Sequence, residues 1–199
     1  NVEIRADGVS YDLIHEGKSN HIAANLPGRF SVYNSLAAAA SAYIAGIPAD
    51  SAAKSISQIG GVKGRMEIVP TGRDFTVIID YAHTPDALEN VCKALCGIKS
   101  GRLVTLFGCG GNRDKGKRPK MAKTAAENSD FLIITSDNPR NEEPGDIIKD
   151  ILAGLEGCST PYAVVEDRIE AINYAVNNAQ KDDIILLAGK GHETYQILK

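Results

Sequence analysis

The chain has 199 residues, of which 43% are hydrophobic and 24% charged, and its formal net charge is -3 at pH 7. These values are ordinary for a globular protein, exclude a disordered or fibrous chain, and argue against a general nucleic-acid binder. No apolar run approaches the roughly 18 residues that span a bilayer, and no charged-then-apolar start indicates a secretory signal, so we expect a cytoplasmic protein without membrane insertion.

Residues 1–62 are expected to form the first of two domains. Asp7-Gly8 between two alternating runs predicts a β-hairpin, and an alanine-rich stretch closed by a glycine and a proline predicts a helix. A glycine cluster at residues 60–64 marks the boundary to the second domain, residues 63–199. The expected strands are residues 2–5, 9–14 and 21–26, and the expected helices are residues 30–44 and 48–59.

Beyond the boundary, short apolar runs alternate with helical patterns. Thr84 and Pro85 suit the N-cap and first position of a helix. The expected strands are residues 66–69, 75–79, 102–107, 131–135, 162–165, 183–187 and 193–198, and the expected helices end near residues 97, 128, 155 and 180. Strands alternating with helices of this length predict an α/β fold, a parallel sheet covered on both faces through right-handed crossovers.

Residues 135–140, Thr-Ser-Asp-Asn-Pro-Arg, follow the apolar run 131–134. Such a run is typical of a buried parallel strand, and ligands bind at the carboxyl ends of these strands. Pro139 excludes helix at Asn138, and Arg140 presents a planar fork of donors that fits a carboxylate or a phosphate. Alone, the pattern favours an ordinary Asn-Pro turn with a solvated arginine. Two other strand-end loops with similar chemistry argue for a site.

The first of these is the glycine-rich loop at residues 108–118. Counted from Gly111 it nearly matches a P-loop, but Arg118 stands at the Ser/Thr position. Counted from Gly108 it fails the dinucleotide fingerprint, because Arg113 replaces the third glycine. A glycine loop with clustered cations still predicts a local anion site, the alternative being a solvated basic turn. The cations are Arg113, Lys115, Lys117 and Arg118.

The second is residues 188–193, where glycines on either side of a lysine allow close approach to a ligand. Glu193 can accept a hydrogen bond from an ammonium group. Together with the cations Arg113 and Arg140, this anion complements an amino acid zwitterion.

Asp80 ends another predicted strand, and His83 follows three residues later. This acid suits either acceptance from a sugar hydroxyl or a charge near a helix N-terminus. Zinc spacing, a Gly-x-Ser-x-Gly elbow and paired Cys-x-x-Cys motifs are absent from the sequence. We therefore assign no metal ligand and no catalytic residue.

Five motifs occur in the order seen in bacterial Mur ligases, and the chain most resembles the branch that adds the third residue of the peptidoglycan stem. They are Val-Lys-Gly-Arg-Met-Glu at 62–67, Asp-Tyr-Ala-His-Thr-Pro at 80–85, Gly-Cys-Gly-Gly-Asn-Arg-Asp at 108–114, Asp-Asn-Pro-Arg at 137–140 and Gly-Lys-Gly-His-Glu at 189–193. The resemblance implies that residues 1–62 are the tail of a central ATP-binding domain. It implies that residues 63–199 are the carboxyl-terminal domain, with a Rossmann-like, mostly parallel sheet and helices on both faces.

The resemblance further implies an ATP-dependent amide ligase. ATP phosphorylates the terminal carboxylate of UDP-MurNAc-L-Ala-D-Glu, and the amine of the incoming amino acid attacks the acyl phosphate. The Asp-Asn-Pro-Arg form of the loop implies meso-diaminopimelate, whose second carboxylate Arg140 can engage and which lysine lacks. The partners are thus small molecules, and we expect a monomer that binds no nucleic acid.

The resemblance also implies the residues of the site. Those around the incoming amino acid are Arg113, Asn138, Pro139, Arg140, Gly189 and Glu193. Those around ATP are Asn34, Arg65, Asp80 and His83. Many relatives have asparagine at the position of Ser31, so no binding role is assigned to Ser31.

The sequence contains no valid P-loop. In the family, ATP and Mg²⁺ are bound mainly by a part that precedes this segment, and phosphoryl transfer depends on that positioning. Because the chain begins at Asn1 and ends within an apolar run, we expect a fragment that is inactive alone. Three alternatives stay open: a lysine-adding homologue, a noncatalytic anion- or nucleotide-binding module, and a folate or polyglutamate ligase.

Overall fold

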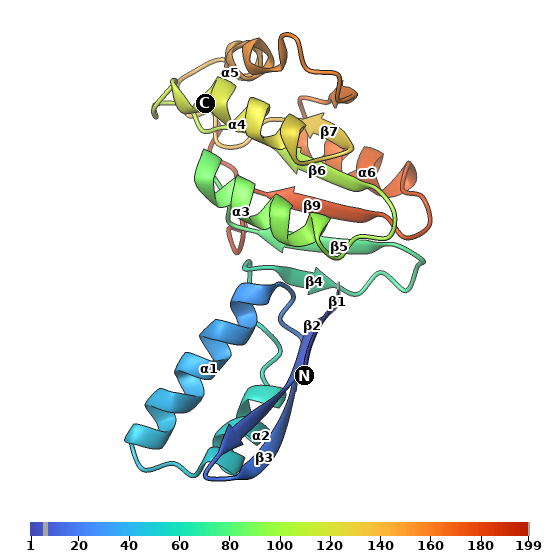
Figure 1. Ribbon diagram of the computed structural model, residues 1–199. Coiled ribbons are helices and arrows are strands. Elements are labelled where there is room, and N and C mark those ends of the chain that lie inside the picture. The colour runs from blue at the N-terminus through green and yellow to red at the C-terminus, as the bar shows by residue number, and fades with distance from the viewer. Residues whose placement is uncertain (6–7, 199) are drawn as a thin grey trace. The chain divides into compact units, whose positions relative to one another are not determined.

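The computed structural model describes residues 1–5 and 8–198 (Figure 1). The chain divides into two compact units, Asn1–Val62 and Lys63–Lys199. Asp7, the first residue of the predicted hairpin turn, lies outside the described residues. None of the described helices combines the length and the apolar character that crossing a membrane requires.

The first unit is an antiparallel sheet with two helices. Its strands are β1 (Val2–Arg5), β2 (Gly8–His15) and β3 (Lys18–Ala24), in that order in the sheet. The helices are α1 (Arg29–Ile44) and α2 (Ala49–Ser57). β3 begins three residues before its predicted start, because Glu16 and Gly17 both adopt positive φ and form a two-residue hairpin turn.

A separate hydrophobic core holds the first unit together. It joins side chains of the sheet, among them Val9 and Ile22, to small side chains of the two helices, among them Ala39 and Ala53. Small residues let helices approach a sheet closely, which accounts for the alanine-rich sequence of α1.

The second unit contains a six-stranded sheet of order β4-β5-β9-β6-β7-β8. The strands are β4 (Glu67–Val69), β5 (Thr76–Asp80), β6 (Leu103–Phe107), β7 (Phe131–Ile134), β8 (Tyr162–Val164) and β9 (Ile184–Ala188). β4 pairs antiparallel at one edge and all other pairs are parallel. The predicted mostly parallel sheet is confirmed.

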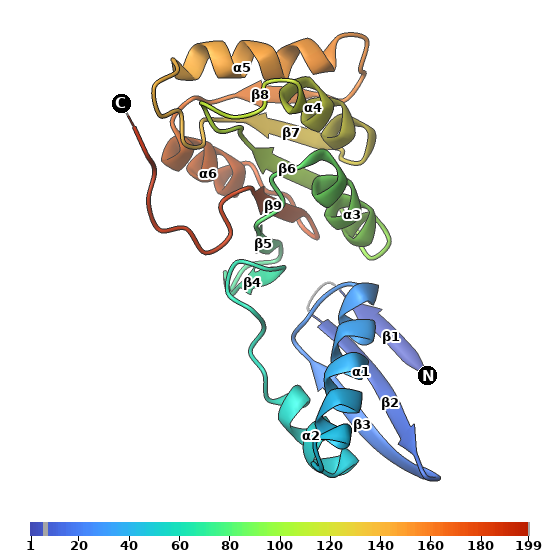
Figure 2. The same ribbon diagram turned by 90° about the vertical axis from the view of Figure 1, so that its left-hand side faces the viewer.

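Helices cover both faces of this sheet, as predicted (Figure 2). They are α3 (Pro85–Cys96), α4 (Lys117–Glu127), α5 (Pro144–Leu152) with a 3₁₀ turn at Ala153–Leu155, and α6 (Arg168–Asn177). α3 and α4 lie on one face and α6 on the other, while α5 packs against α4. Thr84 caps α3 by accepting from the Ala87 amide at 3.3 Å, as predicted.

The predicted last strand at residues 193–198 is wrong. This segment forms no strand and runs along the loop that follows β7. The Ile197 amide donates to Asn138 Oδ1 at 2.8 Å, and the Ile197 carbonyl accepts from the Arg140 amide at 3.2 Å. The Ile197 amide thus bonds a side chain where a strand residue would bond the backbone of a neighbouring strand. The segment is therefore not part of the sheet.

Candidate functional site

Three loops meet at the carboxyl edge of the second unit's sheet, following β6, β7 and β9. The Gly111 amide donates to the Asn138 carbonyl at 2.9 Å. A Cβ on Gly111 would lie 1.8 Å from the Pro139 carbonyl oxygen, and one on Gly108 would lie 2.3 Å from that of Thr135. Only glycine therefore allows the first two loops to touch.

Lys190 lies at the centre of a cluster of polar side chains that these loops contribute. Its ammonium lies 3.0 Å from Asp137 Oδ1, 3.0 Å from Asn138 Oδ1 and 3.5 Å from Glu193 Oε2. Glu193 also accepts from Asn138 Nδ2 at 3.2 Å and from the Tyr81 hydroxyl at 3.4 Å. These five side chains hold one another, so the rim of the site is preorganised.

Arg140 projects from the same rim with its charge unmatched. Its Nη1 donates to the carbonyl oxygens of Gly111 and Asn138, at 3.0 and 3.3 Å. It has no carboxylate partner among the described residues. Its φ of 54° lies in the left-handed region that non-glycine residues rarely adopt, and such strain concentrates in ligand-binding loops. A half-buried guanidinium bound only to neutral oxygens can still receive an anion.

Arg113 stands beside Arg140 across Gly110. A Cβ on Gly110 would lie 2.9 Å from Arg140 Nη1 and 3.7 Å from Arg113 Cγ. The Arg113 side chain is exposed, and within the described part of the chain it forms no hydrogen bond or ion pair. The loops thus present two cations that are not neutralised internally.

The structure corrects the prediction that the four cations of the glycine loop form an anion site. Arg118 is fully buried, and its guanidinium bonds Glu142 through two hydrogen bonds of 3.0 Å and Asp150 at 2.8 Å. Lys115 pairs with Glu142, and Lys117 donates to the His83 carbonyl. Three of the four cations therefore bind protein groups, because the loop folds back onto acids that lie distant in the sequence.

The charges of this ion-pair cluster stabilise one another. Burial alone would lower the pKa of the Arg118 guanidinium, but its two carboxylate partners hold that pKa above the usual value. The hydrogen bonds from Arg118, with the Asn112 amide, lower the pKa of Glu142 to about 2. The cluster fixes the loops after β6 and β7 to each other and leaves no open anion site at Arg118.

The residues expected around ATP lie partly on the loop after β5. Asp80 is buried, and its carboxylate oxygens accept from the amides of Met66 and Ala82 at 2.9 and 2.8 Å. The Arg65 guanidinium lies 4.4 Å from the centre of the Tyr81 ring, and the exposed His83 packs edge-on against the same ring. Asn34 is exposed on α1 of the first unit. Contact of these residues with ATP stays a prediction.

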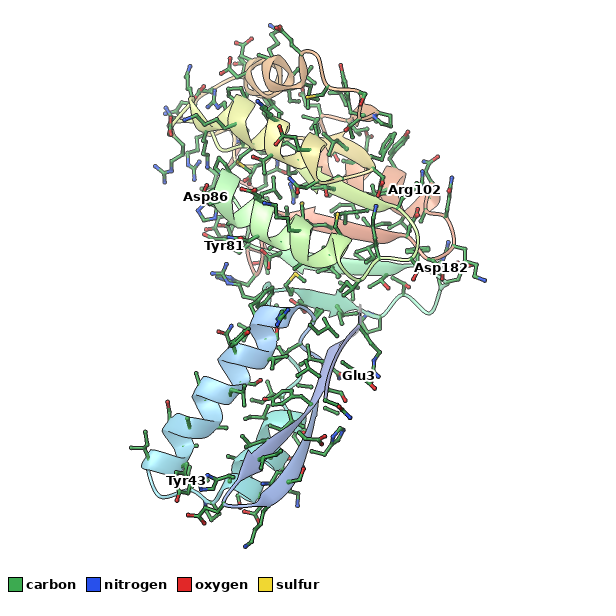
Figure 3. All side chains as sticks on the ribbon, in the orientation of Figure 1. Glu3, Tyr43, Tyr81, Asp86, Arg102 and Asp182 are labelled. Carbon is green, nitrogen blue, oxygen red and sulfur yellow. The ribbon has the colours of Figure 1, made fainter. Side chains whose placement is uncertain are left out.

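Three site residues were missed in the sequence: Tyr81, Asp137 and Lys190. Tyr81, labelled in Figure 3, links the ring contacts of Arg65 to the carboxylate of Glu193. All three lie inside the motifs at residues 80–85, 137–140 and 189–193, so their position in these motifs could have indicated a role in the site. Gly189, which was predicted, adopts a φ of 104° and donates its amide to the Asp80 carbonyl, which joins the loops after β9 and β5.

Comparison with known proteins identifies the family. Residues 64–191 match the family model described as "Mur ligase, glutamate ligase domain". This chain belongs to the Mur ligase family. The predicted relationship is thereby confirmed.

Several Mur ligases resemble the chain over nearly its whole length. The UDP-N-acetylmuramoyl-L-alanyl-D-glutamate–2,6-diaminopimelate ligase of Caldanaerobacter subterraneus is 53% identical over 96% of the chain, and that of Clostridioides difficile is 50% identical over 97%. The chain spans only 39% and 40% of these Mur ligases.

Two solved structures share the fold. A structure of a UDP-N-acetylmuramoyl-L-alanyl-D-glutamate–2,6-diaminopimelate ligase matches with a TM-score of 0.74 and 37% identity, over 99% of this chain and 40% of that one. The folylpolyglutamate synthase of Thermotoga maritima matches with a TM-score of 0.70 and 18% identity, over 94% of this chain and 42% of that one. The second likeness concerns the fold alone.

Proposed function

We propose that this chain is the carboxyl-terminal part of an ATP-dependent ligase that adds meso-diaminopimelate to UDP-MurNAc-L-Ala-D-Glu. In this proposal ATP and Mg²⁺ activate the nucleotide-linked carboxylate as an acyl phosphate, and the second unit delivers the amine that attacks it. The enzyme acts in the cytoplasm as a monomer. Its relatives of about 50% identity carry names that specify this substrate pair.

The observation that carries the proposal is the unmatched charge of Arg140. Its guanidinium is fixed by two carbonyl oxygens and has no described carboxylate partner, while Arg113 lies nearby without a partner of its own. Two open cations favour a ligand with two carboxylates. Glu193, whose carboxylate is held by Asn138 Nδ2, supplies the acceptor for the ammonium group of the ligand.

Discrimination between diaminopimelate and lysine follows from this charge balance. A charge-assisted hydrogen bond contributes roughly 1.5 to 3 kcal/mol, and a guanidinium desolvated without its partner costs more. Lysine has no second carboxylate for Arg140. We therefore expect the ligase to prefer meso-diaminopimelate over lysine by at least about tenfold in kcat/KM.

The proposal assigns the remaining residues by their position. Arg113, Asn138, Pro139, Arg140, Gly189 and Glu193 surround the incoming amino acid. Arg65 and His83, which flank the Tyr81 ring, face the nucleotide, and Asp80 shapes the loop that carries them. The first unit, with Asn34, is the tail of the ATP-binding domain. Since the chain contains no P-loop, it forms no amide bond by itself.

The test is the Arg140→Ala substitution in the full-length ligase, with kcat/KM measured for meso-diaminopimelate and for lysine. We expect the value for diaminopimelate to fall at least about tenfold and the value for lysine to change little, because only the former engages Arg140. Lys149→Ala is the matched control, since this exposed cation of the same unit pairs with Asp146 alone among the described residues. Equal losses for both amino acids in Arg140→Ala would contradict the proposal, as would a wild-type preference for lysine.

A further inference from the structure

Arg168 lies buried beneath the proposed amino-acid site and takes no direct part in it. It is the first residue of α6 and is 7% exposed. The preceding carbonyl of Glu166 accepts from the Ser136 amide at 3.0 Å and from the Thr135 hydroxyl at 3.1 Å. The start of α6 is therefore anchored to the loop after β7, which carries the Asp-Asn-Pro-Arg motif.

The guanidinium reaches across to the loop after β9. Nη2 donates to the carbonyl of Ala188, the last residue of β9, at 2.9 Å. Nη1 is buried and has no hydrogen-bond partner among the described residues. Arg168 thus ties together the bases of two of the three site loops while one of its buried donors stays open.

A buried cation with an open donor is costly unless anions compensate its charge. Burial lowers the pKa of the Arg168 guanidinium, and the carboxylates of Asp137 and Glu193 act against this. Those two carboxylates share the single ammonium of Lys190, at 3.0 and 3.5 Å. Asp137 Oδ1, although close to Lys190, forms no hydrogen bond within the described part of the chain. Arg168 is the second cation that makes this partly buried group of four charges neutral.

We propose that Arg168 is a positioning residue for the amino-acid site, which holds the end of β9 and balances Asp137 and Glu193. This inference rests on the proposed function, because it assumes that Glu193 faces the incoming amine. Without Arg168, two carboxylates would compete for Lys190, and Glu193 would be drawn away from the ligand. The residue acts through its hydrogen bond to Ala188 and through its positive charge, and it touches no substrate.

The experiment compares Arg168→Met with Arg168→Lys in the full-length ligase. We expect Arg168→Met to raise the KM for meso-diaminopimelate at least about tenfold and to leave the KM for ATP within about twofold, because Arg168 holds the loops after β7 and β9, which carry the proposed amino-acid contacts. Arg168→Lys should recover most of the loss, since it restores the buried charge. If Arg168→Met only disturbed packing, Arg168→Lys would not restore activity, and the KM values for meso-diaminopimelate and ATP would change together.

Arg102→Met is the matched control. Arg102, which precedes β6, forms an ion pair at 2.6 Å with Asp183, which precedes β9, and it lies at the end of the sheet opposite to Tyr81 (Figure 3). We expect this variant to lower thermal stability without changing either KM. Equal increases of both KM values in Arg168→Met, no increase at all, or failure of Arg168→Lys to rescue would overturn the inference.

A second measurement separates this inference from the proposed function. If the wild-type ligase does not use meso-diaminopimelate, the proposed function is wrong. Hydrogen exchange at the amides of residues 189–191 then decides the role of Arg168. Faster exchange there in Arg168→Met, and not in Arg102→Met, supports positioning of the loop after β9, and unchanged exchange overturns it.

Discussion

Glu142 collects hydrogen bonds from Arg118, the Asn112 amide and Lys115. These donors favour the ionised carboxylate and lower its pKa from the usual 4.5 to about 2. A carboxylate whose folded-state pKa is depressed contributes stability that is complete above its unfolded pKa and is lost as the pH falls through its folded pKa. The pH window of this contribution therefore runs from about 4.5 down to about 2.

We predict that wild-type protein loses more stability than Glu142→Gln as the pH falls through this window. The measurement is the urea midpoint of the chain at several pH values between about 5 and about 2. Glu156→Gln serves as the control, because Glu156 forms no hydrogen bond or ion pair in the described structure. Parallel pH curves for wild type and Glu142→Gln would contradict the prediction.

Three arginines near the carboxyl edge of the six-stranded sheet show that the sequence does not predict which partner a charged side chain binds. Arg113 and Arg140 lie in loops after strands, Arg118 lies in the first turn of α4 directly after the glycine loop, and each was a reasonable anion ligand. Their partners among the described residues differ: the exposed Arg113 has none, Arg118 has two carboxylates, and Arg140 has carbonyl oxygens. The acids that neutralise Arg118 come from α5 and the loop before it. No local pattern predicts that encounter.

At the scale of elements, the glycine loop after β6 is shaped by its contact with the loop after β7. Gly111→Ala would place a methyl group 1.8 Å from the Pro139 carbonyl oxygen, a backbone atom that cannot turn away. We expect this substitution to destabilise the protein by about 1 to 3 kcal/mol and to weaken diaminopimelate binding, because the loop must shift. The measurements are urea denaturation and titration calorimetry.

Gly145→Ala is the matched control for that prediction. A Cβ on Gly145 meets only Glu166 Oε2, at an ordinary 3.8 Å, and the residue lies in the first turn of α5. Alanine should be neutral or slightly stabilising there. Equal effects of the two substitutions would show that loop contact does not explain the requirement for glycine at Gly111.

Periodicity predicted most elements because the helices and the central strands of the second unit bury apolar side chains. It failed at residues 193–198, where an apolar run follows the Asn138 side chain and the Arg140 backbone instead of a neighbouring strand. It also carried no information on strand order. Insertion of β9 between β5 and β6 depends on α6 crossing the opposite face of the sheet, a tertiary choice that no local spacing records.

At the scale of the whole molecule, the chain consists of two units with their own hydrophobic cores. We predict that residues 63–199 fold when produced alone and bind meso-diaminopimelate with the affinity of the full chain within about threefold, because every proposed amino-acid contact lies in this unit. Circular dichroism and calorimetry test this. Loss of cooperative unfolding in residues 63–199 would show that the second unit depends on the first.

The central position of β9 has a consequence for synthesis of the protein. β5 and β6 are translated long before β9 and do not pair with each other; β9 fills the space between them. Until the ribosome has released β9, the six-stranded sheet exists only as the parts β4-β5 and β6-β7-β8, each with an open edge that invites aggregation. A premature stop codon before Ile184 would therefore produce two separated half-sheets, and not a smaller working domain.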